Sequence, residues 1–307
     1  QLDHEIESYD GSAGTLIAWV RIPVLFENNQ DTAIYVDYGS SLITSPTENP
    51  AGVWDSNYVG VWHLDESGSG VEGEYKDSTQ YTNHGTGGNT PPATTPIRQP
   101  GKISRGQEFN GDYDVIGILG SEAVGHELDI TVNQVTLEAW ALMHSNRPKP
   151  PLSDAPAGIV GKSDSVTSDQ YFLYQDFEAD RTFEFIVDTG LLAPTVNTDP
   201  LTLSNWYHIV AVKDATKARI YINGSEVRNV DASGALQHAD AMVTIGAYIY
   251  TFDGLIDEVR ISNTARNACW IGTSHKNQDA PGAFATVGEE IVLGTFENRK
   301  QITLNVS

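Results

Sequence analysis

A short polar loop offers the oxygen atoms that a calcium ion binds. Residues 77–83 read Asp-Ser-Thr-Gln-Tyr-Thr-Asn, so a carboxylate and an amide bracket several hydroxyl groups. Calcium takes roughly six to eight oxygen ligands from carboxylates, amides and main-chain carbonyls. Asp and Asn are also ordinary turn-forming residues, so they could instead only shape the loop. Asp77 and Asn83 are therefore candidate calcium ligands, with a plain turn as the alternative.

Three aromatic residues alternate along residues 248–252, and this pattern suits the binding of sugars. Tyr248, Tyr250 and Phe252 could form a platform against which a pyranose ring stacks. Tyr248 and Tyr250 are therefore candidate ligand-binding residues for a glycan. Aromatic residues on a strand also pack into a core or pair with neighbours across the sheet, which is the competing interpretation.

The charge of the chain restricts its partners. Its 307 residues include 18 Lys and Arg against 41 Asp and Glu, a formal net charge of -23. Such a protein repels nucleic acids and anionic membranes, so we expect neither as a partner and regard divalent cations as the plausible ionic ones. No apolar run reaches the roughly 18 residues that a membrane-spanning helix needs, so no membrane insertion is expected. The hydrophobic content of 39% suffices for a core in one large β domain or two smaller ones.

The single cysteine restricts the ways in which the chain can be stabilised. Cys269 excludes an internal disulfide and any Cys-x-x-Cys metal or redox site. Stability must therefore come from burial and from bound metal. Because Trp270 follows it, we expect Cys269 to pack in a core.

The pattern of apolar residues is that of short antiparallel strands. Residues 206–212 and 218–222 consist mainly of β-branched and aromatic residues, and the second run alternates between two faces. Asn223 and Gly224 supply the positive φ angles of a type I′ turn into the next strand. Many such segments follow one another, separated by Gly, Pro and Asn, without long helical periodicity. This organisation predicts a two-sheet β-sandwich.

Two of these segments carry a family resemblance. Residues 252–261 read Phe-Asp-Gly-Leu-Ile-Asp-Glu-Val-Arg-Ile, and residues 205–212 read Asn-Trp-Tyr-His-Ile-Val-Ala-Val. Together they resemble the signature of laminin-G-like domains, which implies an all-β, concanavalin-type jelly-roll β-sandwich that binds sugars, proteins or neighbouring subunits. In such folds a structural calcium commonly ties an early loop to the final core strand. The resemblance therefore adds Asp257 to Asp77 and Asn83 as metal ligands.

Some concanavalin-type sandwiches are glycoside hydrolases that carry a Glu-x-Asp-x-x-Glu pattern, which this sequence lacks. Asp257 and Glu258 are adjacent on a predicted strand, where successive side chains point to opposite faces, so they cannot form a catalytic pair. The sequence also lacks a His-Glu-x-x-His motif, a Gly-x-Ser-x-Gly elbow and a phosphate-binding Gly loop. We therefore expect no enzyme, although a carboxylate pair assembled from distant strands stays open.

The two ends of the chain resemble a second family, a domain of unknown function that often precedes laminin-G-like modules in secreted bacterial and archaeal proteins. Segments within residues 2–39 resemble its C-terminal half, and residues 298–304, Asn-Arg-Lys-Gln-Ile-Thr-Leu, resemble its first strand. This resemblance implies three parts. They are a smaller, incomplete β domain at 1–49, the sandwich at 50–291, and a linker with the first strand of a following β domain at 292–307.

The second half of that domain thus comes first in this chain and its opening strand comes last. Two architectures follow from this inverted order. The chain could be one unit of a long array of alternating modules. Alternatively, the incomplete N-terminal domain leaves strand edges unpaired, and the C-terminal strand of another copy could fill them through main-chain hydrogen bonds. Such a head-to-tail contact does not close on itself and builds a filament. The residues expected in this subunit-linking strand are Arg299, Gln301, Ile302, Thr303 and Leu304.

These observations favour a non-catalytic, calcium-stabilised module outside the cell or at the cell surface. It would act in adhesion, or as a building block that polymerises into a filament by strand donation. Its partners would be other copies of itself, with glycans as a further ligand. The alternative is a carbohydrate-binding, lectin-like module of a polysaccharide-degrading enzyme.

Overall fold

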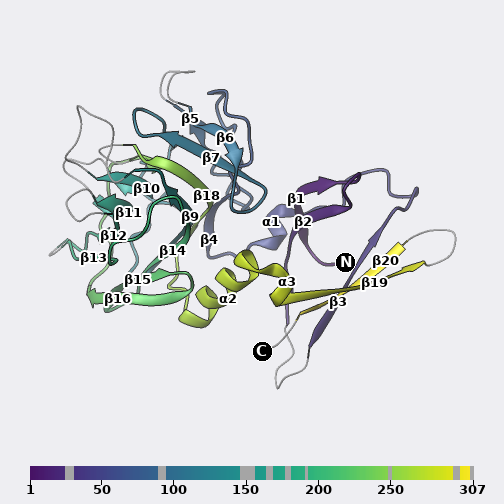
Figure 1. Ribbon diagram of the computed structural model, residues 1–307. Coiled ribbons are helices and arrows are strands. Elements are labelled where there is room, and N and C mark those ends of the chain that lie inside the picture. The colour runs from purple at the N-terminus through teal and green to yellow at the C-terminus, as the bar shows by residue number, and fades with distance from the viewer. Residues whose placement is uncertain are drawn as a thin grey trace.

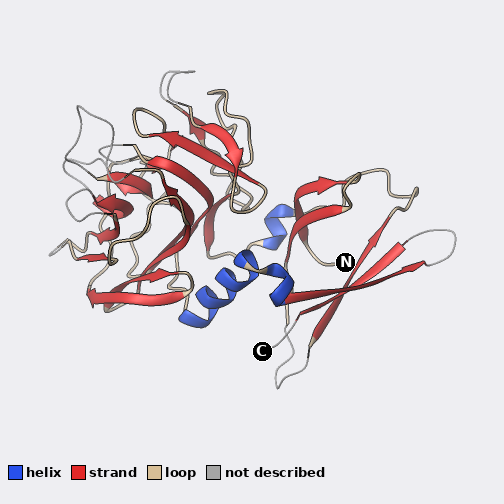
Figure 2. Cartoon of the chain, viewed as in Figure 1, coloured by secondary structure: helices blue, strands red, loops and turns tan. Residues whose placement is uncertain are grey.

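Strands dominate the structure, and the few helices are short (Figure 2). The prediction of an all-β chain is confirmed. Within the described part of the chain, no helix is long and apolar enough to cross a membrane. The computed structural model describes residues 1–24, 31–88, 95–145, 156–163, 169–176, 181–190, 193–247, 251–292 and 298–304.

Two antiparallel sheets form the predicted sandwich, which makes up the larger part of the molecule (Figure 1). One sheet contains, in spatial order, β13 (Thr195–Asn197), β12 (Thr182–Val187), β11 (Asp169–Asp176), β10 (Ala157–Ser163), β17 (Val243–Ile245), β8 (Ile116–Ile118) and β5 (Thr86–Gly87). The other contains β16 (Ser225–Asp231), β15 (Lys217–Ile222), β14 (Trp206–Lys213), β9 (Val135–Met143), β18 (Asp253–Ser262), β7 (Arg105–Asn110) and β6 (Ile97–Pro100), and β4 (Tyr58–Trp62) also pairs with β18.

The apolar core lies between these sheets, because alternate side chains of each strand point inward. In β15, Ala218 and Ile220 belong to the core, whereas Tyr221 packs on the opposite side of the sheet. Asn223 and Gly224 have φ angles of 50° and 79°, so the predicted type I′ geometry at this turn is confirmed.

A smaller β domain lies beside the sandwich (Figure 1). Its hairpin lies close to the sandwich, while its three-stranded sheet extends away from it. In this sheet the C-terminal strand is central, paired on both sides. The elements are β1 (His4–Asp10) and β2 (Thr15–Val20) in the hairpin, α1 (Pro50–Val53) after it, and β19 (Ala285–Val292), β20 (Asn298–Leu304) and β3 (Thr32–Tyr38) in the sheet.

Helix α2 (Ala268–Asp279) connects the sandwich to α3 (Pro281–Phe284) and β19. Two contacts hold the first turn of this helix. Asn267 caps it by accepting a hydrogen bond from the Trp270 backbone N–H, and Ile271 packs against apolar residues of β14 and β15. Cys269 is exposed on this helix, so the expectation that it packs in a core is wrong.

The division of the chain differs from the predicted one. The boundary expected at residue 291 falls inside β19, which pairs with β20 and so belongs to the small domain. The C-terminal strand, expected to pair with another copy, pairs with β3 of its own chain, with Arg299 opposite Asp37 and Leu304 opposite Thr32. The predicted pairing of the two ends is therefore present, but within one chain. The resemblance of these ends to a domain of unknown function stays a prediction.

Candidate functional site: a buried charge network between the hairpin and the sandwich

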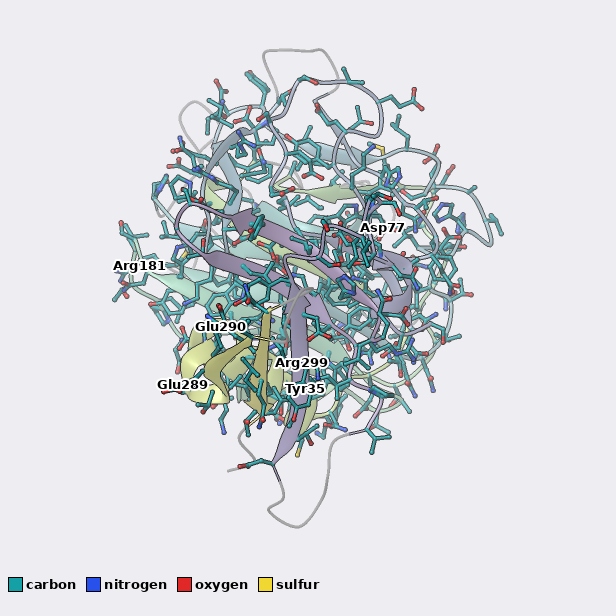
Figure 3. The ribbon with its side chains drawn as sticks, turned by 90° about the vertical axis from the view of Figure 1, so that its right-hand side faces the viewer. Tyr35, Asp77, Arg181, Glu289, Glu290 and Arg299 are labelled. Carbon is teal, nitrogen blue, oxygen red and sulfur yellow. The ribbon has the colours of Figure 1, made fainter. Side chains whose placement is uncertain are left out.

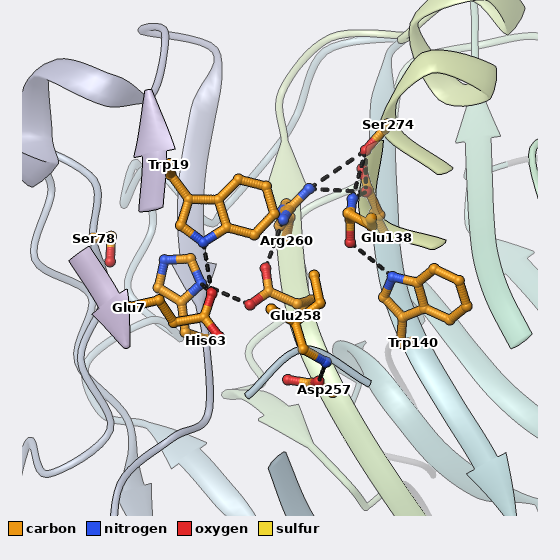
Figure 4. A network of polar contacts seen from close by, with 12 residues as sticks. Glu7, Trp19, His63, Ser78, Glu138, Trp140, Asp257, Glu258, Arg260 and Ser274 are labelled. Carbon is orange, nitrogen blue, oxygen red and sulfur yellow. Dashed lines mark hydrogen bonds and ion pairs between the residues drawn. The ribbon is translucent and has the colours of Figure 1, made fainter. Parts of the chain in front are cut away.

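A network of ionic side chains joins the β1–β2 hairpin to the eight-stranded sheet (Figure 4). The hairpin supplies carboxylates and an indole, and the sandwich supplies an imidazole, a guanidinium and further carboxylates. Burying an ionic group lowers the free energy of unfolding unless the group is paired with an opposite charge. The members are Glu5 and Glu7 of β1, Trp19 of β2, His63 directly after β4, Glu138 of β9, and Glu258 and Arg260 of β18.

Two β-bulges bring the central carboxylates together. β1 shifts its register against β2 at Glu7, which has no partner residue in β2. β18 shifts against β9 between Asp257 and Arg260, and Glu258 there has a φ of 52°, which non-glycine residues rarely adopt. A bulge turns a side chain out of the regular alternation of a strand. Strain of this kind persists only where the surrounding contacts hold it.

His63 stands at the centre of the network. Its Nδ1 lies 2.8 Å from Oε1 of Glu258 and 3.7 Å from Oε2 of Glu7, and its Nε2 lies 3.3 Å from Oε2 of Glu5. The indole of Trp19 stacks on the imidazole, with ring centroids 5.6 Å apart. The same indole donates its N–H to Oε2 of Glu7 at 2.7 Å. Three carboxylates and an indole therefore enclose one imidazole.

Arg260 extends the network across the sheet. Its guanidinium donates to Oε2 of Glu258 at 2.6 Å and to Oε1 of Glu138 at 3.0 Å. It also lies 4.5 Å from the ring centroid of Trp19, in cation–π distance. One cation thus bridges two buried carboxylates and contacts the hairpin.

Glu138 carries the network on to helix α2. Its Oε1 accepts hydrogen bonds from Ser274 at 2.8 Å and from Nε2 of Gln278 at 3.2 Å, and lies 3.0 Å from Nε2 of His208. The indole N–H of Trp140 donates to Gln278 at 2.7 Å. The hairpin, the sandwich and α2 are therefore linked by one continuous set of polar contacts.

The pKa values follow from burial and from the neighbouring charges. Burial raises the pKa of Glu7 to about 8, and the charge of Glu258 adds to the effect. Burial alone would lower the pKa of His63, but Glu258 holds it well above its usual value. Burial would raise the pKa of Glu138, but Arg260 holds it well below its usual range. At neutral pH, Glu7 is therefore protonated, His63 and Arg260 are cationic, and Glu138 is anionic.

The predicted calcium ligands Asp77 and Asn83 lie together in a loop that is closed by hydrogen bonds. The carboxylate of Asp77 accepts four, from the backbone N–H groups of Val61, Thr79 and Asn83 and from the Thr79 hydroxyl, at 2.8–2.9 Å. The amide of Asn83 donates to the carbonyl of Val59 at 2.8 Å. These contacts are the ones that the alternative interpretation, a turn, requires.

Asp257, the third predicted calcium ligand, makes no hydrogen bond with Asp77 or Asn83. Its Oδ2 accepts the backbone N–H of Ile103 at 2.8 Å, and its Oδ1 has no hydrogen-bond partner among the residues that the structure describes. Burial, together with the charge of Glu258, raises the pKa of Asp257 well above its usual value. The structure thus brings together two of the three residues, and the calcium site stays a prediction.

The predicted aromatic platform is only partly described. Tyr248 and Tyr250 lie outside the described residues. Phe252 is fully buried in the sandwich core, so the core interpretation holds for this residue. A glycan site on the two tyrosines stays a prediction.

The outer face of the seven-stranded sheet carries a polar row that sequence reasoning missed. Tyr174, Glu184 and Asn197 are cross-strand neighbours on β11, β12 and β13. They face away from the core, because the adjacent Leu173 and Phe183 belong to it. The Tyr174 hydroxyl donates to Glu184 at 2.8 Å, and the Asn197 amide donates to the same carboxylate at 3.4 Å. The available signal was a single glutamate between two phenylalanines in β12.

The predicted subunit-linking strand is held by its neighbour β3. The guanidinium of Arg299 donates to both carboxylate oxygens of Asp37, at 2.6 and 2.8 Å, and lies 5.2 Å from the ring of Tyr35. The hydroxyl of Tyr35 donates to Gln301 at 3.3 Å. Figure 3 shows Tyr35 and Arg299 near each other, below the labelled Glu290 and Asp77 in this view.

Comparisons with known proteins agree on the fold. Residues 120–272 match the family described as the Concanavalin A-like lectin/glucanases superfamily. No curated protein matches the chain. Domain 4 of AbnA, a GH43 extracellular arabinanase from Geobacillus stearothermophilus solved in complex with arabinotriose, is similar with a TM-score of 0.50 and 17% identity, over 70% of this chain and 97% of that domain.

Two toxin domains are also similar in structure. The binding domain of Paraclostridial Mosquitocidal Protein 1 has a TM-score of 0.54 at 12% identity, over 72% of this chain. The binding domain of Botulinum Neurotoxin DC, solved in complex with SialylT, has a TM-score of 0.52 at 10% identity, over 73% of this chain. This chain covers 52% of each. The sandwich therefore has the concanavalin-type jelly-roll fold, and residues 120–272 are the part that matches this superfamily in sequence.

Proposed function

We propose that the protein is a non-catalytic, extracellular binding module whose sandwich binds carbohydrate. The observation that carries this proposal is the row formed by Tyr174, Glu184 and Asn197 on the outer face of the seven-stranded sheet. The fold supports it, since similar structures include one solved with arabinotriose and one solved with SialylT. Asp176 of β11 is a second carboxylate beside Glu184, but the two share a hydrogen bond and so lie too close together to hold a glycosidic bond between them as hydrolysis requires.

The chemistry of the row suits sugar hydroxyl groups. Tyr174 is 9% exposed, so the groups that reach solvent are chiefly the carboxylate of Glu184 and the amide of Asn197. A carboxylate accepts hydrogen bonds from neighbouring hydroxyls, and an amide both donates and accepts. A few such groups beside an aromatic ring, on a rigid sheet, fix the orientation of a small ligand.

Isothermal titration with arabinotriose and with a sialylated oligosaccharide tests this proposal. Glu184→Gln should weaken binding about tenfold to a hundredfold, because it removes a charge-assisted hydrogen bond. Glu226→Gln, a glutamate on β16 outside the row, is the matched control and should bind as the unmodified protein does. If Glu184→Gln leaves binding unchanged, the sugar binds elsewhere. If no glycan column retains the protein, the proposal is wrong.

A second candidate function is assembly into a fibre, and the exposed three-stranded sheet favours it. Val287, Ile291 and Val292 of β19 are exposed, the last at 70%. Among the described strands, β19 and β3 pair only with β20, so each presents an unpaired edge. A second copy that exchanges its C-terminal strand would form the same β3–β20 register between subunits and bring further surface to this sheet.

A disulfide between β3 and β20 distinguishes exchange from pairing within one chain. Ile34 and Ile302 are cross-strand partners, so both are replaced by Cys in a Cys269→Ser background. If strands are exchanged, oxidation should give a ladder of covalent oligomers on a non-reducing gel. A single monomer band would contradict exchange. Thr286→Cys with Thr303→Cys is the control, because β19 and β20 are adjacent in sequence and join within one chain in either case.

A further inference from the structure

Three ligand-type atoms from two parts of the fold converge on one point. Glu7, His63 and Glu258 each offer a carboxylate oxygen or ring nitrogen, and the three atoms lie within 4.8 Å of one another. His63 Nδ1 is 2.8 Å from Glu258 Oε1 and 3.7 Å from Glu7 Oε2. The ligands of a tetrahedral ion at about 2.0–2.2 Å are roughly 3.4 Å apart. The His63–Glu7 distance is close to this spacing, whereas Glu258 must draw back from the imidazole by roughly 0.6 Å to admit an ion in place of the hydrogen bond.

In the described part of the chain, one of the three side chains has an oxygen without a hydrogen-bond partner. The Glu7 side chain is 1% exposed, and its Oε1 accepts no hydrogen bond from any described residue. A buried carboxylate oxygen without a donor is unfavourable. Oε2 of the same carboxylate is the oxygen near His63 and accepts the Trp19 N–H, so a cation bound by this carboxylate would supply the partner that Oε1 lacks.

Neighbouring polar groups orient the other two side chains, Glu258 and His63, as such groups usually orient metal ligands. Arg260 donates to Oε2 of Glu258, which leaves Oε1 directed at His63. Glu5 lies behind the imidazole and accepts a hydrogen bond from Ser78 at 2.5 Å; its Oε2 is 3.3 Å from Nε2, at ion-pair distance but without hydrogen-bond geometry. A small rotation would let it accept the second N–H, as carboxylates beside metal-bound histidines commonly do.

The total charge is the same with a metal ion as with protons. Glu5, Glu7, Glu138 and Glu258 contribute four negative charges when ionised, and Arg260, shared by Glu138 and Glu258, contributes one positive charge. Protons on Glu7 and His63 leave one net negative charge in the group. One divalent ion in place of these two protons gives the same total, so the ion adds no uncompensated charge to the buried site.

We propose that Glu7, His63 and Glu258 bind one divalent transition-metal ion, with zinc as the best match. One imidazole nitrogen and two carboxylate oxygens are ligands that zinc accepts, whereas calcium takes oxygen ligands. Because Glu7 belongs to the hairpin and the other two residues to the sandwich, the ion fastens the small domain to the sandwich. This site is separate from the loop at Asp77 and does not depend on sugar binding.

Cobalt titration of the full chain tests the site after bound metal has been stripped by a chelator and the chelator removed. Co²⁺, a spectroscopic substitute for Zn²⁺, should give visible absorption that saturates at one ion per chain and disappears when Zn²⁺ displaces it. Glu7→Gln keeps the shape of the side chain and removes its charge. It should weaken Co²⁺ binding at least about tenfold, and His63→Gln should do the same.

A matched control distinguishes metal binding at these three residues from non-specific binding of cations to an acidic protein. Glu66 is another glutamate with a buried oxygen that lacks a partner among the described residues, but it is not one of the three converging residues. Glu66→Gln should bind Co²⁺ as the unmodified protein does, and Zn²⁺ should raise the Tm of both but not that of Glu7→Gln. Absence of saturable Co²⁺ and Zn²⁺ binding, or equal binding by Glu7→Gln, would overturn the proposal.

Discussion

Replacing Arg260 by Met should lower the free energy of unfolding by about 3–5 kcal/mol, the cost of breaking a buried ion pair by removing one partner. The change leaves the carboxylates of Glu258 and Glu138 buried without their shared cation. It also removes the guanidinium that contacts the indole of Trp19. Denaturant unfolding followed by tryptophan fluorescence measures the loss, provided that the slope of the transition stays unchanged.

Two further variants show whether position or charge causes the loss. Arg260→Lys keeps the charge but cannot bridge both carboxylates with a planar fork, so it should lose less than the Met variant. Arg299→Met removes a cation paired with Asp37 on the exposed three-stranded sheet, where ion pairs contribute about 0–1 kcal/mol. A loss for Arg260→Met no larger than that for Arg299→Met would contradict the role of the network as the link between the domains.

The sandwich was predictable because short stretches of sequence specify each of its strands and turns. Alternating faces identify a strand such as residues 218–222, and Asn223 with Gly224 identifies the turn that follows. The partial complementarity of the two ends was predictable as well, since residues 298–304 do pair with a strand of the N-terminal segment. Whether that pairing occurs within a chain or between chains depends on the relative positions of distant segments. Strand composition does not contain this information.

The charge network was not predictable, because its members meet only in the folded chain. His63 and Glu258 are separated by 195 residues, and Arg260 and Glu138 by 122. On a regular strand, Asp257 and Glu258 point to opposite faces, but the bulge at Glu258 breaks that alternation. The only signal in the sequence was the presence of single charged residues in apolar strands, such as Glu138 within β9.

The metal-free protein should lose stability as the pH rises from about 5 to about 9. Glu7 has a folded-state pKa of about 8 against an ordinary value of 4.5, so the folded state binds more protons than the unfolded state between these values. Stability that depends on this proton is complete below the unfolded pKa and is lost as the pH rises through the folded pKa. His63, whose pKa is also raised, contributes in the same direction. Glu138, whose pKa is lowered, contributes stability that is lost in acid.

Glu7→Gln isolates the contribution of one carboxyl to this alkaline loss. The amide is neutral at every pH and faces the same groups, namely His63, Glu258 and Asp65. In EDTA, the variant should therefore lose about 2–4 kcal/mol less than the unmodified protein between pH 5 and 9, with the remaining slope due to other groups whose pKa is raised, His63 and Asp257 among them. Urea midpoints across this range measure both curves, and Glu289→Gln on the exposed strand β19 should follow the unmodified one. Parallel curves for Glu7→Gln and the unmodified protein would mean that the Glu7 carboxyl is already ionised at pH 5. The hairpin would then be held to the sandwich by His63 and Arg260 without the proton that the burial of Glu7 implies.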